Sequence, residues 1–391
     1  MHVLYVVGQG EGGLPHYTAE LANAVTARHD VTVVKPKETT ADDLFDPAVD
    51  VIEPFQSIDL SMSKIYSGDV DPRTFLEGMY SYDALERVAD LPVDLVHEPT
   101  GLFPHVKFFM RYHGIDTEFP LIVTKHEVPR PRFSLSRPAV FLEELLNVAI
   151  PDVRADAGVV HTSAQKDALV DYGHNPESIE VIPHGSYSVF GTGTTAVDER
   201  DPSILFFGNL VPPKGIDTFV KAIPLVQREL PDVTAIVAGD GDLPAATAPI
   251  LDAWRDTFEI HNHFIPNDAV GHFFDRAQVV ALPYRDQDGT KGHSGVFSTA
   301  TSFGTPVVAS NVGMFPEYVR ETGAGLVVDP ENPARLADAL VRVLRNDDER
   351  ATMAANSETV AAELSWESVA EAHSELYERV LAEGDSPTVP L

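Results

Sequence analysis

The chain has 391 residues, of which 43% are hydrophobic and 23% are charged, as in soluble globular proteins of two or three domains. Acidic residues outnumber basic ones by 60 to 28, and the formal net charge of −32 argues against a nucleic-acid partner, because phosphate backbones require a basic surface. The sequence contains no cysteine, which excludes disulfides, thiolate metal sites and cysteine nucleophiles.

The acidic residues are spread along the whole chain rather than gathered in a tail. Such a distribution suits a halophilic protein, because concentrated salt screens the repulsion between carboxylates. No apolar run reaches the ~18–20 residues of a membrane span, and the N-terminus lacks the basic region of a signal peptide. We therefore expect a cytoplasmic protein.

The first half of the chain alternates apolar strands with helices. Val3–Val7 is predicted to be a strand, Gly8–Leu14 a glycine turn and Pro15–Arg28 a helix. Further buried strands are predicted at Val31–Val34, Leu95–Val96, Leu121–Thr124, Gly158–His161 and Ile179–Ile182. Continuous apolar strands between helices indicate a parallel sheet covered on both faces.

The segment Phe190–Asp201 is small, polar and without periodicity, and is predicted to be a linker. After it the alternation restarts, and a terminal helix is expected at Trp366–Ala382. The predicted strands of this half are Ile204–Phe207, Thr234–Ala238, Val279–Leu282, Val307–Ala309 and Leu326–Val328. We expect an α/β protein with two doubly wound domains, residues 1–188 and 189–365, facing a central cleft, and a disordered tail at 385–391.

A glycine-rich turn near the N-terminus satisfies the dinucleotide-binding pattern G-x-G-x-x-G with Gly8, Gly10 and Gly13. The acidic residue that would hold a ribose hydroxyl after the second strand is missing, however, since Val31–Val34 runs into Lys35. A nicotinamide site is therefore disfavoured. Two alternatives stay open: a tight turn without a ligand, and a turn that lines the cleft and contacts a substrate.

Two strand–turn–helix units in the second half predict a site for a nucleoside diphosphate. In Gly292–Ser310, small residues precede a helix whose positive dipole end favours an anion. In the other unit, Lys214 stands beside a glycine at a helix start, after two prolines that stiffen the turn. An ammonium group in this position suits phosphate oxygens.

Other polar residues are weaker candidates. His97 and His126 each follow an apolar strand, where side chains face the ligand cleft of a doubly wound sheet, although a single such histidine is easily structural. Two D-x-D strings begin at Asp240 and Asp286 and are compatible with a metal, but 60 acidic residues produce such strings by chance. We expect no metal site and no cofactor.

A basic cluster interrupts the acidic chain, and its members are Lys125, Arg130, Arg132 and Arg137. These residues are either paired with neighbouring carboxylates or mark a surface for an anionic partner. Such a partner would be a phosphate-bearing or lipid-linked acceptor, or the inner membrane face, to which the protein would bind peripherally.

The chain resembles glycosyltransferase family 4, the retaining enzymes with the GT-B fold, over nearly its whole length. The resemblance rests on five segments in a characteristic order: GGLPHYTAELANAV, VIPHGSYSVF, FFGNLVPPKGID, GTPVVASNVGMFPEYV and LSWESVAEAHSELY. It implies a first, acceptor-side domain, a second domain for a nucleotide sugar, and a terminal helix, 366–384, that crosses back to the first domain.

The chain departs from the family pattern in two ways. Asn209 stands where the family usually has an arginine, and the paired glutamates of E-x7-E fall on Lys291 and Thr299. The sequence instead looks like a subgroup with P-Y-R followed by S-G-V, in which Arg285 or Lys291 would supply the missing positive charge.

The resemblance also implies roles for individual residues. His126 would lie near the reacting sugar, Lys214 would act on the leaving diphosphate, and Gly12 and Gly13 would line the acceptor side. The remaining substrate-binding candidates are His97, Asn209, Arg285, Lys291, Ser294, Gly295, Val296 and Thr299.

The sequence therefore predicts a hexosyltransferase that acts with retention and without metal on a nucleoside diphosphate sugar. Its leaving diphosphate would deprotonate the acceptor on the same face, and lysine, amides and helix dipole would stabilise the departing charge. Three alternatives remain: a nucleotide-sugar epimerase of the same fold, a non-catalytic nucleotide-binding module, and a dehydrogenase.

Overall fold

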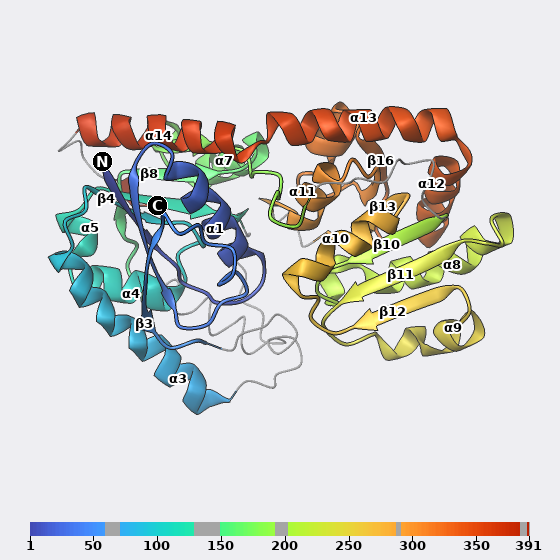
Figure 1. Ribbon diagram of the computed structural model, residues 1–391, viewed down its shortest axis with the longest axis horizontal. Coiled ribbons are helices and arrows are strands. Elements are labelled where there is room, and N and C mark those ends of the chain that lie inside the picture. Colours follow the sequence, from blue (N-terminus) through green and yellow to red (C-terminus); the bar gives the residue numbers. More distant parts are fainter. Residues whose placement is uncertain (59–70, 129–148, 192–201, 287–290, 384–388, 391) are drawn as a thin grey trace. The chain divides into compact units, whose positions relative to one another are not determined.

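The computed structural model describes the chain except for residues 59–70, 129–148, 192–201, 287–290, 384–388 and 391 (Figure 1). The chain divides into two compact units. The first unit comprises Met1–His184, Lys291–His293 and Trp366–Leu391, and the second comprises Gly185–Thr290 and Ser294–Ser365. The division after His184 lies close to the predicted domain boundary at residue 188, whereas Lys291–His293, predicted in the second domain, group with the first unit.

The described strands of the first unit form a seven-stranded parallel sheet in the order β3-β2-β1-β4-β5-β8-β9. The order runs outward in both directions from β1 and β4, as in doubly wound folds. The strands are β1 His2–Val6, β2 Asp30–Pro36, β3 Asp50–Phe55, β4 Leu95–Glu98, β5 Leu121–Lys125, β8 Ala157–Val160 and β9 Ile179–Val181.

Helices cover this sheet because its strands are apolar on both faces. Leu4 and Val6 point to a core that includes Phe109 of α4 and Tyr82 of the 3₁₀ helix η1. The helices are α1 Gly13–Val25, α3 Pro72–Tyr80, η1 Ser81–Asp90, α4 Pro104–Tyr112, α5 Ile115–Glu118, α7 Ser163–Asp171, η2 Pro176–Ser178 and α14 Trp366–Glu383. The terminal helix α14 packs on α1, which confirms that it crosses back to the first unit (Figure 1).

Two short antiparallel pairs complete the first unit. β6 Glu127–Val128 pairs with β14 Lys291–Gly292, and β7 Arg154–Ala155 pairs with β17 Val389–Pro390. The second pair corrects the prediction of a disordered tail at 385–391, because two residues of that segment are held by strand pairing.

The described strands of the second unit form a six-stranded parallel sheet in the order β12-β11-β10-β13-β15-β16. They are β10 Ser203–Phe207, β11 Thr234–Gly239, β12 Phe258–Asn262, β13 Val279–Leu282, β15 Val307–Ser310 and β16 Gly325–Val328. Alternate residues serve two cores: Ile204 packs with α8 and α12, and Leu205 packs with α10 and α11. Two doubly wound sheets therefore confirm the predicted α/β architecture.

The helices of the second unit lie on both faces of its sheet (Figure 1). They are the 3₁₀ turn η4 Pro212–Lys214, α8 Ile216–Glu229, η5 Ala245–Thr247, α9 Ala248–Ala253, α10 Asn267–Arg276, α11 Gly295–Ser302, the π-helix η6 Pro316–Glu321, α12 Pro333–Arg345 and α13 Asp347–Glu363. None of the helices in the described ranges combines the length and apolarity that crossing a bilayer requires.

Within the two parallel sheets, the strands that the sequence did not predict are β3 and β12, and both are sheet edges. Their burial explains the omission, since four of the six residues in β3 are exposed and no residue of β12 is fully buried. An edge strand needs no continuous apolar run, and a continuous apolar run is the pattern that predicts a buried strand. The predicted linker lies almost entirely outside the described residues.

Candidate functional site

In doubly wound sheets, ligands bind at the carboxyl ends of the strands where the strand order reverses. This point lies between β10 and β13 in the second unit and between β1 and β4 in the first. The candidate residues are therefore those that follow these strands.

The turn that carries Lys214 follows β10 and is fixed against the end of β13. Gly215 has a left-handed backbone with φ of 73°, and a side-chain carbon there would overlap the carbonyl oxygen of Pro283. The amide of Arg285 also donates to the carbonyl of Pro213 at 2.9 Å. Glycine is thus required for the close approach that brings Lys214 to the strand end.

Tyr284 connects Lys214 with the start of α11. The Lys214 ammonium donates to the Tyr284 hydroxyl at 2.8 Å and lies 4.0 Å from the centre of its ring. The same hydroxyl is 2.9 Å from Oγ of Ser294. The structure therefore brings together two of the predicted site residues, Lys214 and Ser294, through Tyr284, the tyrosine of the P-Y-R motif, which was not predicted as a site residue.

The first residues of α11 supply amide donors next to Ser294, which contacts Tyr284. The side chain of Ser294 caps the helix by accepting from the Phe297 amide, and the Ser294 amide donates to the sulfur of Met314 at 3.1 Å. Ser294 therefore contributes a hydroxyl, since its amide is already engaged. Gly295 and Val296 are the first two residues of the helix. Amides in this position have no acceptor within the helix and form the positive end of its dipole.

Arg285, predicted to supply a positive charge to the diphosphate, is held in an ion-pair network. Its guanidinium contacts the carboxylates of Asp217 at 2.6 Å and Glu331 at 3.1 Å. Burial acts to raise the pKa of Asp217, but hydrogen bonding from Lys221 and the charge of Arg285 hold this pKa below its usual value. Binding a diphosphate through Arg285 would require these two ion pairs to open.

Three further residues that were predicted to bind substrate make other contacts. They are Thr299, Asn209 and Lys291. The Thr299 hydroxyl donates to the carbonyl of Gly295, within its own helix, at 3.0 Å. Asn209 lies in the turn after β10, where its carbonyl accepts from the Val211 amide. Lys291 was predicted on a turn before the helix, but its backbone belongs to β14 and pairs with Val128 in the first unit.

In the first unit, the glycines after β1 divide into packed and open positions. A side-chain carbon at Gly8 would contact Val106, and one at Gly10 would contact the carbonyl of Glu38. Gly12, the N-cap of α1, has φ of 77° and open space where a side chain would stand, and Gly13 begins the helix. Gly12 is thus the position of the turn with open space beside it, and Gly13 is exposed.

His97, predicted to bind substrate, is fully buried. Its Nδ1 is 2.8 Å from the hydroxyl of Tyr377 in α14, and its Nε2 is 2.8 Å from the hydroxyl of Thr124 in β5. The Tyr377 hydroxyl also contacts that of Tyr5 in β1 at 2.9 Å. His97 therefore links the terminal helix α14 to the sheet by hydrogen bonds.

His126 follows β5 and lies in a cluster of aromatic rings. Its Nε2 is 2.8 Å from the carbonyl of Pro99, and its Nδ1 is 3.0 Å from Nε2 of His161. Burial lowers the pKa of His126 to about 4, and the hydrogen bond to Pro99 opposes this shift. The ring of Tyr17 packs edge-on at 4.7 Å. Both ring nitrogens of the predicted catalytic histidine are therefore engaged by the protein.

The loop that holds His126 is itself fixed by a buried carboxylate. Glu98 accepts from the amides of Thr100, Gly101 and Leu102, and it also contacts the Thr100 hydroxyl. Burial raises the pKa of Glu98 to about 7, although these hydrogen bonds lower it. The loop includes Pro99, so Glu98 helps to place the carbonyl that receives His126.

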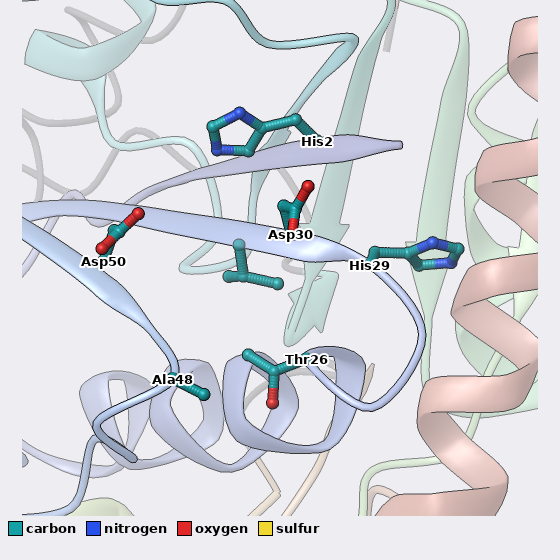
Figure 2. Close-up of a pocket in the computed structure, with 7 residues that line it drawn as sticks. His2, Thr26, His29, Asp30, Ala48 and Asp50 are labelled. Atoms are coloured by element: carbon teal, nitrogen blue, oxygen red, sulfur yellow. The ribbon is translucent and has the colours of Figure 1, made fainter.

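A pocket of about 400 Å³ in the first unit lies away from these residues. Figure 2 shows it lined by His2, Asp30 and Asp50, the first residues of β1, β2 and β3. It stands at the amino ends of the strands, the edge at which doubly wound sheets do not bind ligands. Within the described ranges, no group of three His, Asp or Glu side chains is arranged to hold a metal ion. The predicted basic residues Arg130, Arg132 and Arg137 fall outside those ranges.

Two family models match the chain. One described as "Glycosyltransferase Family 4" matches residues 11–186, and one described as "Glycosyl transferases group 1" matches residues 201–346. Together they cover most of both units.

Curated relatives give the same picture. The chain is 30% identical to a D-inositol 3-phosphate glycosyltransferase of Corynebacterium kroppenstedtii, over 59% of this chain and 54% of that protein. It is 31% identical to a GDP-mannose-dependent alpha-(1-6)-phosphatidylinositol monomannoside mannosyltransferase of Mycobacterium tuberculosis, over 43% of this chain and 45% of that protein. The chain thus spans about half the length of each of these two relatives.

A solved structure with a similar fold is Anabaena Alr3699/HepE in complex with UDP-glucose. It matches with a TM-score of 0.73 and 16% identity, over 97% of this chain and 100% of that chain. This likeness confirms the predicted GT-B-like fold of two Rossmann-type domains.

Proposed function

Because the chain belongs to glycosyltransferase family 4, we propose that it is a hexosyltransferase that uses a nucleoside diphosphate sugar, with retention of configuration and without a metal ion. The observation that carries the proposal is the chain of contacts from Lys214 through Tyr284 to Ser294 at the reversal point of the second sheet. An ammonium group, hydroxyls and helix-start amides are the groups that bind a diphosphate.

The diphosphate would bind between the Lys214 ammonium and the amides of Gly295 and Val296. Tyr284 holds the ammonium by its hydroxyl and its ring, so the charge is placed before the ligand arrives. A preorganised charge of this kind stabilises the negative charge that develops on the leaving group. We assign Lys214 this role in the reaction.

The chemical step needs no nucleophile from the protein. The bond between the anomeric carbon and the diphosphate oxygen breaks, and the acceptor oxygen forms a bond to the same face of that carbon. The acceptor proton passes to the departing phosphate oxygen, so the product is a glycoside and a protonated nucleoside diphosphate. Lys214 and the amides then lower the barrier by stabilising the separating charge.

The acceptor is proposed to carry a phosphate or a phospholipid anchor. The support is the activity by which the two relatives are named: one is an inositol 3-phosphate glycosyltransferase and the other a phosphatidylinositol monomannoside mannosyltransferase. The proposed acceptor-side residues are Gly12, which has open space where a side chain would stand, and its exposed neighbour Gly13. Arg130, Arg132 and Arg137 are the proposed contacts of a peripheral membrane surface.

The proposal is tested by calorimetric titration of UDP, GDP and ADP, followed by transfer assays with UDP-glucose and GDP-mannose and with inositol 3-phosphate as acceptor. Transfer with an α-linked product, insensitive to EDTA, is expected. Release of nucleotide with an epimerised sugar and no acceptor would identify an epimerase. Binding without turnover of any tested pair would identify a nucleotide-binding module.

A further inference from the structure

Four consecutive strand ends of the first sheet are linked by a row of polar contacts. β4, β5, β8 and β9 are neighbours in the sheet, and Pro99, His126, His161 and Ile182 each lie just beyond one of them. The contacts run from the Pro99 carbonyl to His126 at 2.8 Å, from His126 to His161 at 3.0 Å, and from His161 to the Ile182 carbonyl at 3.0 Å. The two histidines therefore form a pair between two carbonyl oxygens.

The number of protons in this row follows from its chemistry. A carbonyl oxygen only accepts, so Nε2 of His126 and Nδ1 of His161 must both carry hydrogen. The two remaining nitrogens face each other at 3.0 Å, and one of them must also carry hydrogen if their lone pairs are not to oppose each other. Three protons on two rings amount to one positive charge.

The backbone on either side of the pair is clamped by Gln165 of α7. Its side-chain oxygen accepts from the amides of His161 and Thr162 at 2.8 and 3.0 Å, and its nitrogen donates to the carbonyl of His126 at 2.8 Å. The separation of the two rings is thus set by the fold and not by the rotation of two free side chains.

We propose that His161 is a positioning residue that fixes the orientation of His126 and shares one additional proton with it, so that the pair acts as a single cation in the proposed sugar transfer. The proposal rests on the proposed function, because it gives His126 the role of a charged ring facing an anionic substrate. His126 is half-buried, whereas His161 is fully buried, so His126 is the exposed end of the pair.

Other titratable groups face the pair from several elements. Tyr17 of α1 lies 4.7 Å from His126 and 5.4 Å from His161, ring centre to ring centre. His184 and His293 lie 5.3 and 5.6 Å from His161, and the charges of His373 and His97 are coupled to the pair. Burial lowers the pKa of His161, and so do the charges of His126, His184 and His373, whereas the hydrogen bond to the Ile182 carbonyl raises it. The shared proton must therefore be held by the hydrogen-bond geometry against desolvation.

The charge is tested by nitrogen-15 NMR of the full chain labelled at histidine, with His126→Gln and His161→Gln used to assign the signals. Three ring N–H groups are expected on the pair, with the third lost only at a higher pH than the extra proton of His105. His105 is the internal control, because it is also buried and its Nε2 donates to one carbonyl, that of Gly8. Two neutral rings down to the pH at which His105 takes up its proton would overturn the shared charge.

The positioning role is tested by a double-mutant cycle on kcat/KM for sugar transfer. His161→Gln should lower kcat/KM by roughly 10²-fold, the effect of a small misplacement in an active site, and should move the alkaline limb of the pH profile to lower pH. The shift has this sign because His126 alone loses its proton more easily. His161→Gln should have no further effect in a His126→Gln background, and the exposed His263→Gln should leave the limb unchanged.

Additive effects of the two substitutions would show that His161 does not act through His126, and would overturn the positioning role. The NMR measurement requires no substrate, so a failure of the proposed transfer activity leaves the test of the charged pair intact. The two failures are therefore distinguishable.

Discussion

Lys214 is the residue on which the proposed diphosphate site depends. Lys214→Ala is expected to lower kcat for transfer by roughly 10²–10³-fold, since one preorganised charge is lost. Lys214→Arg should restore little, because a guanidinium cannot keep the short contact of the ammonium with Tyr284. Steady-state kinetics measure the effect, and Lys221→Ala, which removes an exposed lysine from α8, is the matched control. Full activity of Lys214→Ala would contradict the assignment.

Arg285 shows how a tertiary contact changes the expectation for a single side chain. The sequence favoured it as a second phosphate ligand, but Asp217 and Glu331 engage its guanidinium. Arg285→Ala is therefore expected to weaken UDP or GDP binding less than Lys214→Ala does. Calorimetric titration of both variants measures the difference. A larger loss at Arg285 would mean that the ion pairs open when the nucleotide binds.

At the level of elements, the turn before α8 depends on Gly215. Gly215→Ala should lower the melting temperature and weaken nucleotide binding together, because the added carbon would push the Lys214 turn away from Pro283. Gly173→Ala is the matched control: φ at Gly173 is 98°, but no atom lies within 4 Å of the added carbon. Differential scanning fluorimetry and calorimetry should show a loss of nucleotide binding only for Gly215→Ala. If both variants lost nucleotide binding equally, the strain of a side chain at positive φ, and not the overlap with Pro283, would explain the loss.

The returning helix α14 is the second element whose attachment can be tested. Tyr377→Phe removes the hydroxyl that contacts His97 and Tyr5, and leaves a buried imidazole nitrogen without its partner. The free energy of unfolding should fall by about 1–3 kcal/mol, the cost of an unsatisfied buried polar group. Urea denaturation measures it, with Tyr172→Phe, an exposed tyrosine, as control. An unchanged midpoint for Tyr377→Phe would show that the contact contributes nothing to stability.

At the level of the whole molecule, the net charge of −32 predicts dependence on salt. The melting temperature should rise with potassium chloride from millimolar to molar concentrations, because screening shortens the reach of carboxylate repulsion. Each kcal/mol gained corresponds to roughly 2–4 °C for a domain of this size. Sucrose at matched osmolality is the control, since it does not screen charge. A flat or falling curve in salt would remove the halophilic interpretation.

Buried histidines predict loss of stability in acid. Burial lowers the pKa of His105 and of His373 from 6.5 to about 4, so the unfolded chain binds protons that the folded chain does not. Stability should therefore fall as pH drops from 6.5 towards 4, by about 2 kcal/mol per histidine at pH 5. Urea midpoints at pH 7 and pH 5 in constant salt measure this. His373→Gln should reduce this loss of stability in acid, whereas the exposed His263→Gln should not. An equal loss of stability in both variants would contradict the role of the buried histidine.

The sequence alone was sufficient to predict the central strands and the alternation of strands and helices. The predicted strand Val279–Leu282 coincides with β13, and the terminal helix begins at Trp366 as expected. These features are local, because an apolar run or a helical period is contained in a few consecutive residues. The edge strands β3 and β12 were missed for the same reason, since an exposed edge does not carry that signal.

The tertiary structure decided what the local pattern could not, namely which polar residues are engaged by others far along the chain. The sequence determined that Lys214 stands before a helix start and that His126 follows a strand, because these are properties of neighbouring residues. His97 was also predicted to follow a strand, but it lies within β4. Only the packed fold showed that Tyr377 engages His97 and that His161 pairs with His126. Burial and pairing depend on contacts between distant segments, and no spacing along the chain contains them.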